Sequence, residues 1–278
     1  MKVRKINRTN GFSLIEIAVV LLIISVLVSI VAIPISTQLE QQRITETNKQ
    51  LESIKEALIG YALANGRLPC PATDGANYGT ANSNGGESPV GGGACTVKLG
   101  YVPAATLGVS PVDNSGFAID AWGTTQNRII YGVADTIVNS TGTAGCPLVS
   151  SHPLTTAGGM QLATMDCIAL KTLITVCSSK PAVAAGTATF STSCPVGTTL
   201  TSSAPFVLVS LGKNAPSGGT GADEAQNIDG KLYNQQDQFF VSHTPVAVGA
   251  TNGEFDDIVV WPSLNTLFAR MVQAGKLP

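Results

Sequence analysis

The feature that most constrains this chain is an uncharged apolar run near its beginning. No charged residue occurs from Ile17 to Leu39, and Ile, Val and Leu predominate there. As an α-helix this run would be about 35 Å long, enough to cross a hydrocarbon core of about 30 Å. The basic residues before it are Lys2, Arg4, Lys5 and Arg8, with no acidic residue among them. Because basic flanks stay on the cytoplasmic side, we expect the N-terminus to lie inside.

One carboxylate, Glu16, stands at the start of the apolar run. A charge at the centre of a bilayer costs about 2.5–3.5 kcal/mol on insertion scales, so such a residue is a functional candidate. Position alone leaves a second interpretation open, in which Glu16 is a boundary residue at headgroup level. No small-x-small cleavage motif of a secretory signal follows the run, and a polar helix pattern begins at Gln38 instead.

The segment Gly11-Phe12-Ser13-Leu14-Ile15-Glu16, between a basic leader and a long apolar helix, resembles the N-terminus of type IV pilins and type II secretion pseudopilins. In that family a membrane peptidase cuts after the glycine and methylates the new N-terminal phenylalanine. The resemblance implies cleavage between Gly11 and Phe12, N-methylation of Phe12, and an assembly role for Glu16. The family's glutamate is thought to pair with the N-terminal amine of a neighbouring subunit.

The resemblance further implies a non-enzymatic structural subunit, a minor pilin of a type IV pilus-like filament. Its partners would be other pilin or pseudopilin subunits, the prepilin peptidase, the inner membrane and an assembly platform, with no small-molecule substrate. It would first be a single-pass inner-membrane protein with a periplasmic C-terminal domain, and then part of a filament at the periplasm or cell surface. Two alternatives stay open: a minor pseudopilin of a type II secretion system, and a membrane-anchored periplasmic enzyme or binding protein.

The helix pattern continues beyond the apolar run with a changed character. Apolar residues recur at three- and four-residue spacing at Leu51, Ile54, Leu58, Tyr61 and Ala62. Asn65-Gly66 is a good helix stop. Pro34 removes one backbone hydrogen bond and is expected to kink or loosen the helix. The resemblance implies a leader over 1–11, and we expect a helix over 12–66, transmembrane over 12–36 and amphipathic over 37–66.

The remaining residues, 67–278, are expected to form a periplasmic or extracellular β-rich globular domain. A Gly/Asn/Ser-rich stretch at 74–94 predicts a long surface loop. Strands are predicted at 206–211, 238–242 and 257–261 from their β-branched and aromatic residues. The predicted fold class is α+β: a long N-terminal helix, transmembrane and then amphipathic, packed on an antiparallel β-sheet domain, as in pilins.

Two further local patterns are informative. After Pro262, apolar residues at helical spacing lie between a candidate N-cap, Ser263, and Gly275, which together predict a short C-terminal helix.

Asp120-Ala121-Trp122-Gly123 resembles a segment common in pseudopilins. We expect it to be a turn into a strand, with Trp122 packed on the core.

Six cysteines lie beyond the predicted membrane segment, at Cys70, Cys95, Cys146, Cys167, Cys177 and Cys194. An even count in an exported region favours disulfides. Zinc would need close ligand pairs such as C-x2-C, and no spacing here is that short. Sequential pairing, Cys70–Cys95, Cys146–Cys167 and Cys177–Cys194, closes the shortest loops, although the sequence alone does not decide among the connectivities.

Catalytic motifs are poor. His152 and His243 are the only histidines, and neither a G-x-S-x-G elbow nor an H-E-x-x-H motif is present. The glycine-rich stretch 217–221 lacks the Lys-Ser/Thr that follows the glycines of a phosphate-binding loop. A formal net charge of −2 provides no basic face for general nucleic-acid binding. We therefore expect no enzymatic activity and no catalytic residues.

Acidic residues gather late in the chain, at Asp223, Glu224, Asp229, Asp237, Glu254, Asp256 and Asp257. Calcium favours oxygen ligands from such loops, and some pseudopilins hold calcium in their C-terminal loops. The spacing matches no calcium loop that we can name, and solvated surface carboxylates are the more ordinary interpretation. We expect no metal site and no cofactor, with calcium as the one candidate.

Overall fold

A computed structural model of the chain describes residues 11–75, 81–134, 152–163, 165–169, 173–180, 182–183, 191–217, 219, 221–228, 238–250 and 253–277. The side chains of residues 29–36 lie outside this description. By its internal contacts the chain divides into two units, Met1–Thr45 and Glu46–Pro278. The first contains the beginning of the longest helix, and the second contains the rest of that helix and all of the described strands.

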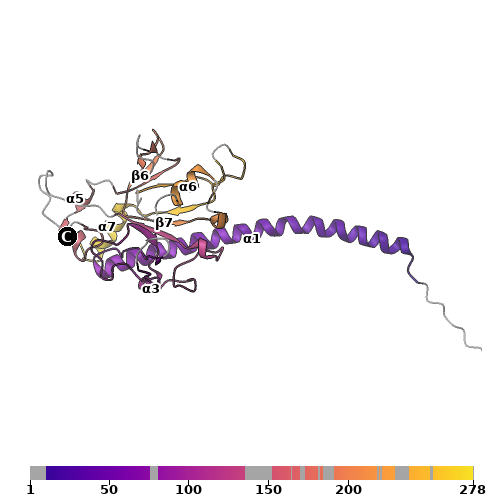
Figure 1. The fold of residues 1–278 in the computed structure, drawn as a ribbon, viewed down its shortest axis with the longest axis horizontal. Coiled ribbons are helices and arrows are strands. Elements are labelled where there is room, and N and C mark those ends of the chain that lie inside the picture. Colours follow the sequence, from indigo (N-terminus) through magenta and orange to yellow (C-terminus); the bar gives the residue numbers. More distant parts are fainter. Residues whose placement is uncertain are drawn as a thin grey trace, which may run out of the picture. The chain divides into compact units, whose positions relative to one another are not determined.

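The long helix, α1, runs from Leu14 to Asn65 and continues through Pro34 (Figure 1). At its first turn the Ser13 backbone N–H donates to Glu16 Oε2 at 2.9 Å. This satisfies one of the donors that a helix N-terminus leaves without a backbone partner. At its end Gly66 adopts φ 66°, and its N–H donates to the Ala62 carbonyl. The glycine therefore ends the helix as the sequence predicted.

The second half of α1 buries one face in the core of the Glu46–Pro278 unit. Leu51, Ile54, Leu58 and Ala62 are buried as predicted, and Ile59 joins them. The predicted stripe is wrong at one position, since the side chain of Tyr61 is only partly buried. Its hydroxyl instead reaches the ion pair described below. Burial of this stripe, rather than helix propensity alone, provides most of the stabilisation of such a helix.

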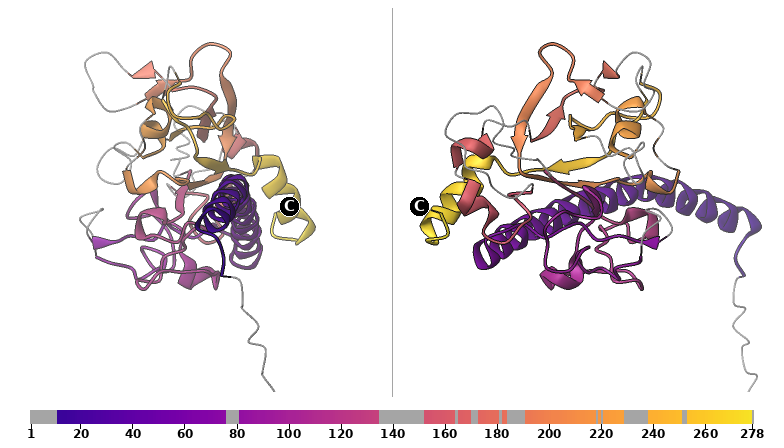
Figure 2. Two further views of the ribbon diagram at one scale, coloured as in Figure 1. Left: turned by 90° about the vertical axis from the view of Figure 1, so that its right-hand side faces the viewer. Right: turned by 60° about the vertical axis from the view of Figure 1, so that its left-hand side comes forward.

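The main sheet has four antiparallel strands in the order β1 (Leu99–Tyr101), β2 (Ile130–Val133), β7 (Phe206–Ser210) and β9 (Ile258–Val260). All five residues of β7 are buried. A strand that is buried on both faces has a continuous run of apolar residues in its sequence. The ribbon views show the second half of α1 along one side of these strands and the smaller sheet on the other (Figure 2). The predicted antiparallel sheet is thus present.

The smaller sheet has three strands in the order β6 (Thr199–Ala204), β3 (Ile174–Cys177) and β8 (Phe239–Val241). β3 pairs with β6 antiparallel but with β8 parallel, so this sheet is mixed. A separate two-stranded ladder joins β4 (Ala182–Val183) to β5 (Ser191–Ser193). Parallel pairing needs a long crossover connection, and the chain supplies it between β3 and β8.

The shorter helices are α3 (Ala104–Leu107), η1 (Thr125–Asn127), α4 (Gly159–Ala163), α5 (Met165–Ala169), η2 (Ala215–Ser217), α6 (Ala222–Ile228) and α7 (Leu264–Gln273). α7 is the predicted C-terminal helix. The Ser263 side chain accepts a hydrogen bond from the Thr266 N–H at 3.1 Å, and Gly275 adopts φ 68° beyond the end. The Lys276 ammonium reaches the Ala64 carbonyl of α1 at 3.3 Å, so α7 lies beside the end of the long helix.

Two of the three expected disulfides are present. Cys70 is bonded to Cys95, and Cys177 is bonded to Cys194. Cys167 is also disulfide-bonded, while Cys146 lies outside the described residues, so the third pairing stays a prediction. Because no described cysteine is a free thiol, thiolate ligands are unavailable in the described part of the chain.

The expected surface loop at 74–94 holds a buried ion pair. Glu87 and Arg67 are each about 95% buried and pair at 2.7 Å. The Tyr61 hydroxyl accepts from Arg67 Nη2, also at 2.7 Å. Burial alone would raise the pKa of Glu87, but the Arg67 guanidinium and the N–H groups of Gly91 and Cys70 outweigh it, so the pKa lies below its usual value. Residues 81–94 are loop and turn as predicted, but Glu87 is buried rather than on the surface.

The Asp-x-Trp-Gly segment is a turn before β2, as expected, but Trp122 is not part of the hydrophobic core. Trp122 is only partly buried, whereas Asp120 is 1% exposed. The Asp120 carboxylate accepts from Ser210 Oγ at 2.6 Å, from the Trp122 N–H at 2.9 Å and from Asn127 Nδ2 at 3.1 Å. Burial raises its pKa, although these hydrogen bonds oppose the change. Asp120 therefore holds the turn against β7, a role that the apolar pattern did not reveal.

Candidate functional site

The N-terminal segment exposes its apolar side chains all round. Every large hydrophobic residue of this set is at least 48% exposed: Phe12, Leu14, Ile15, Ile17, Val19, Val20, Leu21, Leu22, Ile23, Ile24, Val26, Leu27 and Val28. A helix that is apolar on all faces is normally buried in a protein core or in a membrane. Uncovered apolar surface on this scale marks an interaction site.

Two polar side chains of this segment, those of Ser25 and Glu16, form local hydrogen bonds. Ser25 Oγ donates to the Leu22 carbonyl at 2.8 Å, so its hydroxyl needs no outside partner. Glu16 accepts from the Ser13 N–H in a capping arrangement. The sequence carries the signal for this contact, Ser-x-x-Glu before an apolar run, which is the signature of a capping box. Glu16 is exposed, and one of its carboxylate oxygens already accepts a hydrogen bond at the start of the helix.

The predicted cleavage site lies in open space. A Cβ atom built at Gly11 would meet nothing within 4 Å, and Phe12 is 85% exposed. The fold therefore does not require glycine at this position. A requirement for glycine would instead come from an enzyme that reads the segment. Within the described part of the chain, no helix combines the length and the apolarity that crossing a membrane requires.

Comparison with known families identifies this segment. Residues 6–32 match the family described as the prokaryotic N-terminal methylation motif. The chain carries the type IV pilin and pseudopilin signature. The match ends within the first half of α1 and does not reach the Glu46–Pro278 unit. No curated protein and no solved structure matches the chain. Together with the α+β architecture, the motif is consistent with a pilin-like fold.

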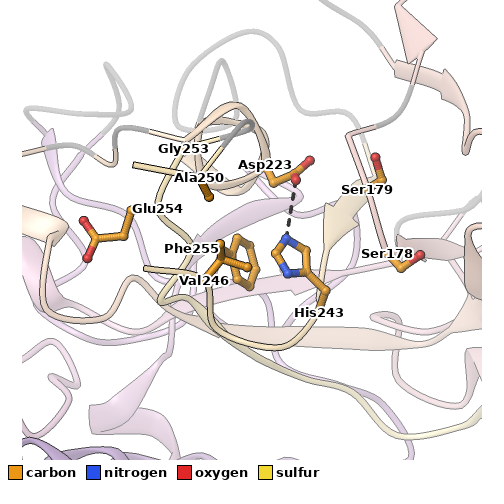
Figure 3. Close-up of a pocket in the computed structure, with 9 residues that line it drawn as sticks. All are labelled: Ser178, Ser179, Asp223, His243, Val246, Ala250, Gly253, Glu254 and Phe255. Atoms are coloured by element: carbon orange, nitrogen blue, oxygen red, sulfur yellow. Dashed lines mark ion pairs between the residues drawn. The ribbon is translucent and has the colours of Figure 1, made fainter. Parts of the chain in front are cut away.

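A second candidate site is a pocket of about 280 Å³ in the Glu46–Pro278 unit (Figure 3). It is lined by Ser178, Ser179, Asp223, His243, Val246, Ala250, Gly253, Glu254 and Phe255. The His243 ring stacks on Phe255 with the ring centroids 3.8 Å apart. Its Nε2 lies 3.4 Å from Asp223 Oδ2. The sequence presents His243 only as a possible catalytic residue and gives no sign that it pairs with Asp223, which is 20 positions earlier.

This arrangement is not a Ser-His-Asp triad. His243 Nδ1 is 2.8 Å from the Thr244 carbonyl, and Nε2 faces the carboxylate of Asp223. In a triad one ring nitrogen is hydrogen-bonded to the acid, and the other faces the serine hydroxyl. The hydroxyls of Ser178 and Ser179 are turned away from the ring (Figure 3). The pocket therefore offers no activated nucleophile among the described residues.

Part of the acidic group predicted from the sequence does come together. Glu224, Asp256 and Asp257 place carboxylate oxygens within 4.8 Å of one another. Asp223 and Glu254 line the pocket instead, and Asp229 and Asp237 lie outside the described residues.

Most of the Glu224 and Asp256 carboxylate oxygens in this cluster already accept hydrogen bonds from N–H groups. Both Glu224 oxygens accept from Asn214 Nδ2, at 2.8 and 3.0 Å, and Oε1 also accepts from the Asp256 N–H. Asp256 Oδ2 accepts from the Lys213 and Asn214 N–H groups, whereas its Oδ1 is buried without a hydrogen-bond partner. Burial and the neighbouring Glu224 raise the pKa of Asp256 to about 7. Calcium binding here stays a prediction.

Proposed function

We propose that this chain is a minor pilin, a non-enzymatic structural subunit of a type IV pilus-like filament. The leader is cleaved after Gly11 and Phe12 becomes N-methylated. Residues 12–36 hold the subunit in the inner membrane, with the C-terminal unit in the periplasm, until an assembly platform adds it to other pilin subunits. The filament then lies in the periplasm or at the cell surface.

One observation carries the proposal. The methylation motif over residues 6–32 overlaps the start of α1, where the described apolar side chains from Leu14 to Val28 are exposed on every face. The Glu46–Pro278 unit, in contrast, buries most of its described large apolar residues in one large core cluster and one small one. The uncovered segment therefore calls for an environment outside this chain, first lipid and then the helices of neighbouring subunits.

Glu16 is the residue we propose for assembly. Moving an apolar helix from lipid into a bundle of helices gains little hydrophobic free energy, because both surroundings are apolar. A polar pair is then better suited to setting register than to supplying bulk stability. Cleavage after Gly11 would create a charged amine on Phe12, a partner of opposite sign for the Glu16 carboxylate of another subunit. The local contact with Ser13 leaves Glu16 exposed and accessible.

The test compares Glu16→Ala and Glu16→Gln with wild type. Membrane insertion should become easier by up to about 3 kcal/mol in Glu16→Ala, so the processed membrane form should accumulate. Docking should fail because a neighbouring Phe12 amine would be buried without its partner, at several kcal/mol. We expect at least a tenfold fall in the ratio of sheared-filament to membrane-bound protein, with Glu16→Gln intermediate.

Glu46→Ala is the matched control, since Glu46 is an exposed carboxylate on the same helix outside the apolar run. It should enter filaments normally. If Glu16→Ala enters filaments as well as wild type, Glu16 is only a boundary residue. A minor pseudopilin would appear in filaments of a type II secretion system, which the genes beside this one would indicate. An anchored periplasmic enzyme would stay with the membrane after shearing.

A further inference from the structure

The pocket beside α6 contains a buried nitrogen with no hydrogen-bond partner. His243 Nε2 is within 3.4 Å of Asp223 Oδ2, but the contact lacks hydrogen-bond geometry. His243 follows β8, and Asp223 lies in the first turn of α6. Figure 3 shows the carboxylate directly beside the ring, with Phe255 against the ring face. A polar atom buried without a partner is unusual in a native protein and calls for an explanation.

The hydrogen bond of the other ring nitrogen, Nδ1, determines whether Nε2 donates or accepts. His243 Nδ1 lies 2.8 Å from the Thr244 carbonyl oxygen, which can only accept, so Nδ1 carries the hydrogen. In the neutral ring Nε2 is therefore an acceptor, and it faces a second acceptor, the Asp223 carboxylate. Two acceptors side by side are stabilised by a cation between them.

Both groups are oriented as metal ligands usually are. A metal-bound histidine commonly donates its second N–H to a backbone carbonyl, and a ligating carboxylate accepts hydrogen bonds of its own. Here Nδ1–H donates to Thr244, and Asp223 Oδ1 accepts from the Lys180 N–H at 2.6 Å. Asp223 Oδ2 and His243 Nε2 face each other, 3.4 Å apart.

The separation of the two atoms fits a shared ion. Zinc binds imidazole nitrogen at about 2.0–2.1 Å and carboxylate oxygen at about 2.0–2.2 Å, and a tetrahedral angle between such bonds places the two ligand atoms about 3.4 Å apart. The observed distance is 3.4 Å. A shared ion also places the oxygen to one side of the ring nitrogen's axis, which agrees with the absence of hydrogen-bond geometry.

We propose that His243 Nε2 and Asp223 Oδ2 bind a divalent transition metal of the zinc class, with water in the remaining positions. The nitrogen ligand favours such a metal over calcium or magnesium, which prefer oxygen. The pocket volume of about 280 Å³ leaves room for water ligands. Glu254 is not included, because its carboxylate points away from the ring (Figure 3). The ion would tie α6 to the end of β8, independently of any filament role.

The chain offers an unusually clean test. His152 and His243 are its only histidines, and no described cysteine is a free thiol. Full-length protein, purified in detergent with a tag that contains no histidine, is titrated with zinc by calorimetry and with cobalt by visible absorbance. Wild type and the control variant His152→Gln should each bind one equivalent. His243→Gln and Asp223→Asn should each bind at least tenfold more weakly.

Thermal unfolding with and without zinc provides a second readout, because a ligand that binds only the folded state raises the midpoint. The midpoint should rise in wild type and His152→Gln but not in the two pocket variants, each first checked for folding by circular dichroism. Asp256→Asn should keep the zinc response, since its carboxylate belongs to a different cluster. The proposal is overturned if wild type binds no zinc, or if His243→Gln binds it as tightly as wild type. The two groups then form an ion pair and nothing more.

Discussion

Asp256→Asn should stabilise the folded chain at neutral and alkaline pH. In the wild type Asp256 Oδ2 accepts from two backbone N–H groups, while Oδ1 is buried without a partner beside the carboxylate of Glu224. Asparagine keeps one oxygen to accept those N–H groups. Its NH₂ replaces the oxygen that lacks a donor, and it can donate to Glu224. The substitution thus imitates the protonated acid.

The size of the effect follows from the raised pKa. Burial and Glu224 move the pKa of Asp256 from 3.8 to about 7. About three pKa units correspond to roughly 4 kcal/mol, because each unit is worth about 1.4 kcal/mol. Asp256 is partly exposed and solvent screens the charge, so we expect roughly 1–2 kcal/mol in practice. For a chain of this size that is a rise of about 2–8 °C in the unfolding midpoint.

The direction of the pH dependence is fixed by the same shift. The folded state holds the Asp256 proton more tightly than the unfolded state does, so stability falls as pH rises. The loss begins above the ordinary pKa of 3.8 and is complete above about 7. Asp256→Asn should remove this part of the slope between about pH 4 and pH 7, the window set by these two values, with little difference from wild type at or below pH 4.

The assay is thermal unfolding followed by circular dichroism across that pH range, in EDTA. Glu46→Gln is the control, an exposed carboxylate whose substitution should leave the curve unchanged. Adding calcium to wild type at pH 8 then tests whether the cluster binds a cation. If it does, calcium should restore the stability that the wild type lacks relative to Asp256→Asn. A lower midpoint for Asp256→Asn at pH 8, or an unchanged slope, would show that the buried Asp256 carboxylate does not destabilise the fold.

Two further predictions concern stability. Glu87→Gln should destabilise the fold by about 3–5 kcal/mol, because the buried Arg67 would lose its countercharge. The double variant Arg67→Met/Glu87→Met should lose less, and urea unfolding of the two compares them. Since the pKa of Glu87 lies below its usual value, its contribution should be present above pH 4.5 and be lost in acid. Removing the disulfide with Cys177→Ser/Cys194→Ser should cost about 3 kcal/mol by the loop-entropy estimate. A loss below 1 kcal/mol would mean that the unfolded chain is already restricted in this region without the disulfide.

Much of the architecture was predictable because local signals agree with tertiary packing. β7 combines β-branched residues with complete burial, so its apolar run was sufficient evidence for a strand. α7 has its N-cap at Ser263 and its terminating glycine at Gly275, both visible in the sequence. The methylation motif was recognisable because its residues are contiguous. In each case the deciding interactions lie within a few residues of one another.

The features that were missed depend on partners far apart in the sequence. Glu87 sits in a glycine-rich stretch, and only its contact with Arg67, 20 residues earlier, explains its burial. Asp120 is held by Ser210, 90 positions away. The parallel pairing of β3 with β8 likewise has no local signal. His243 and Asp223 could be counted from the sequence, but only the fold places them in one pocket.

We propose that the chain is processed at Gly11 and built into a filament through its N-terminal helix. The most direct measurement is mass spectrometry of the chain recovered from sheared filaments, with sequencing of its N-terminal peptide. We expect a chain that starts at Phe12, with an added methyl group on its amine. Filament material that still begins at Met1, or filaments that lack the chain while the membrane holds it, would contradict the account.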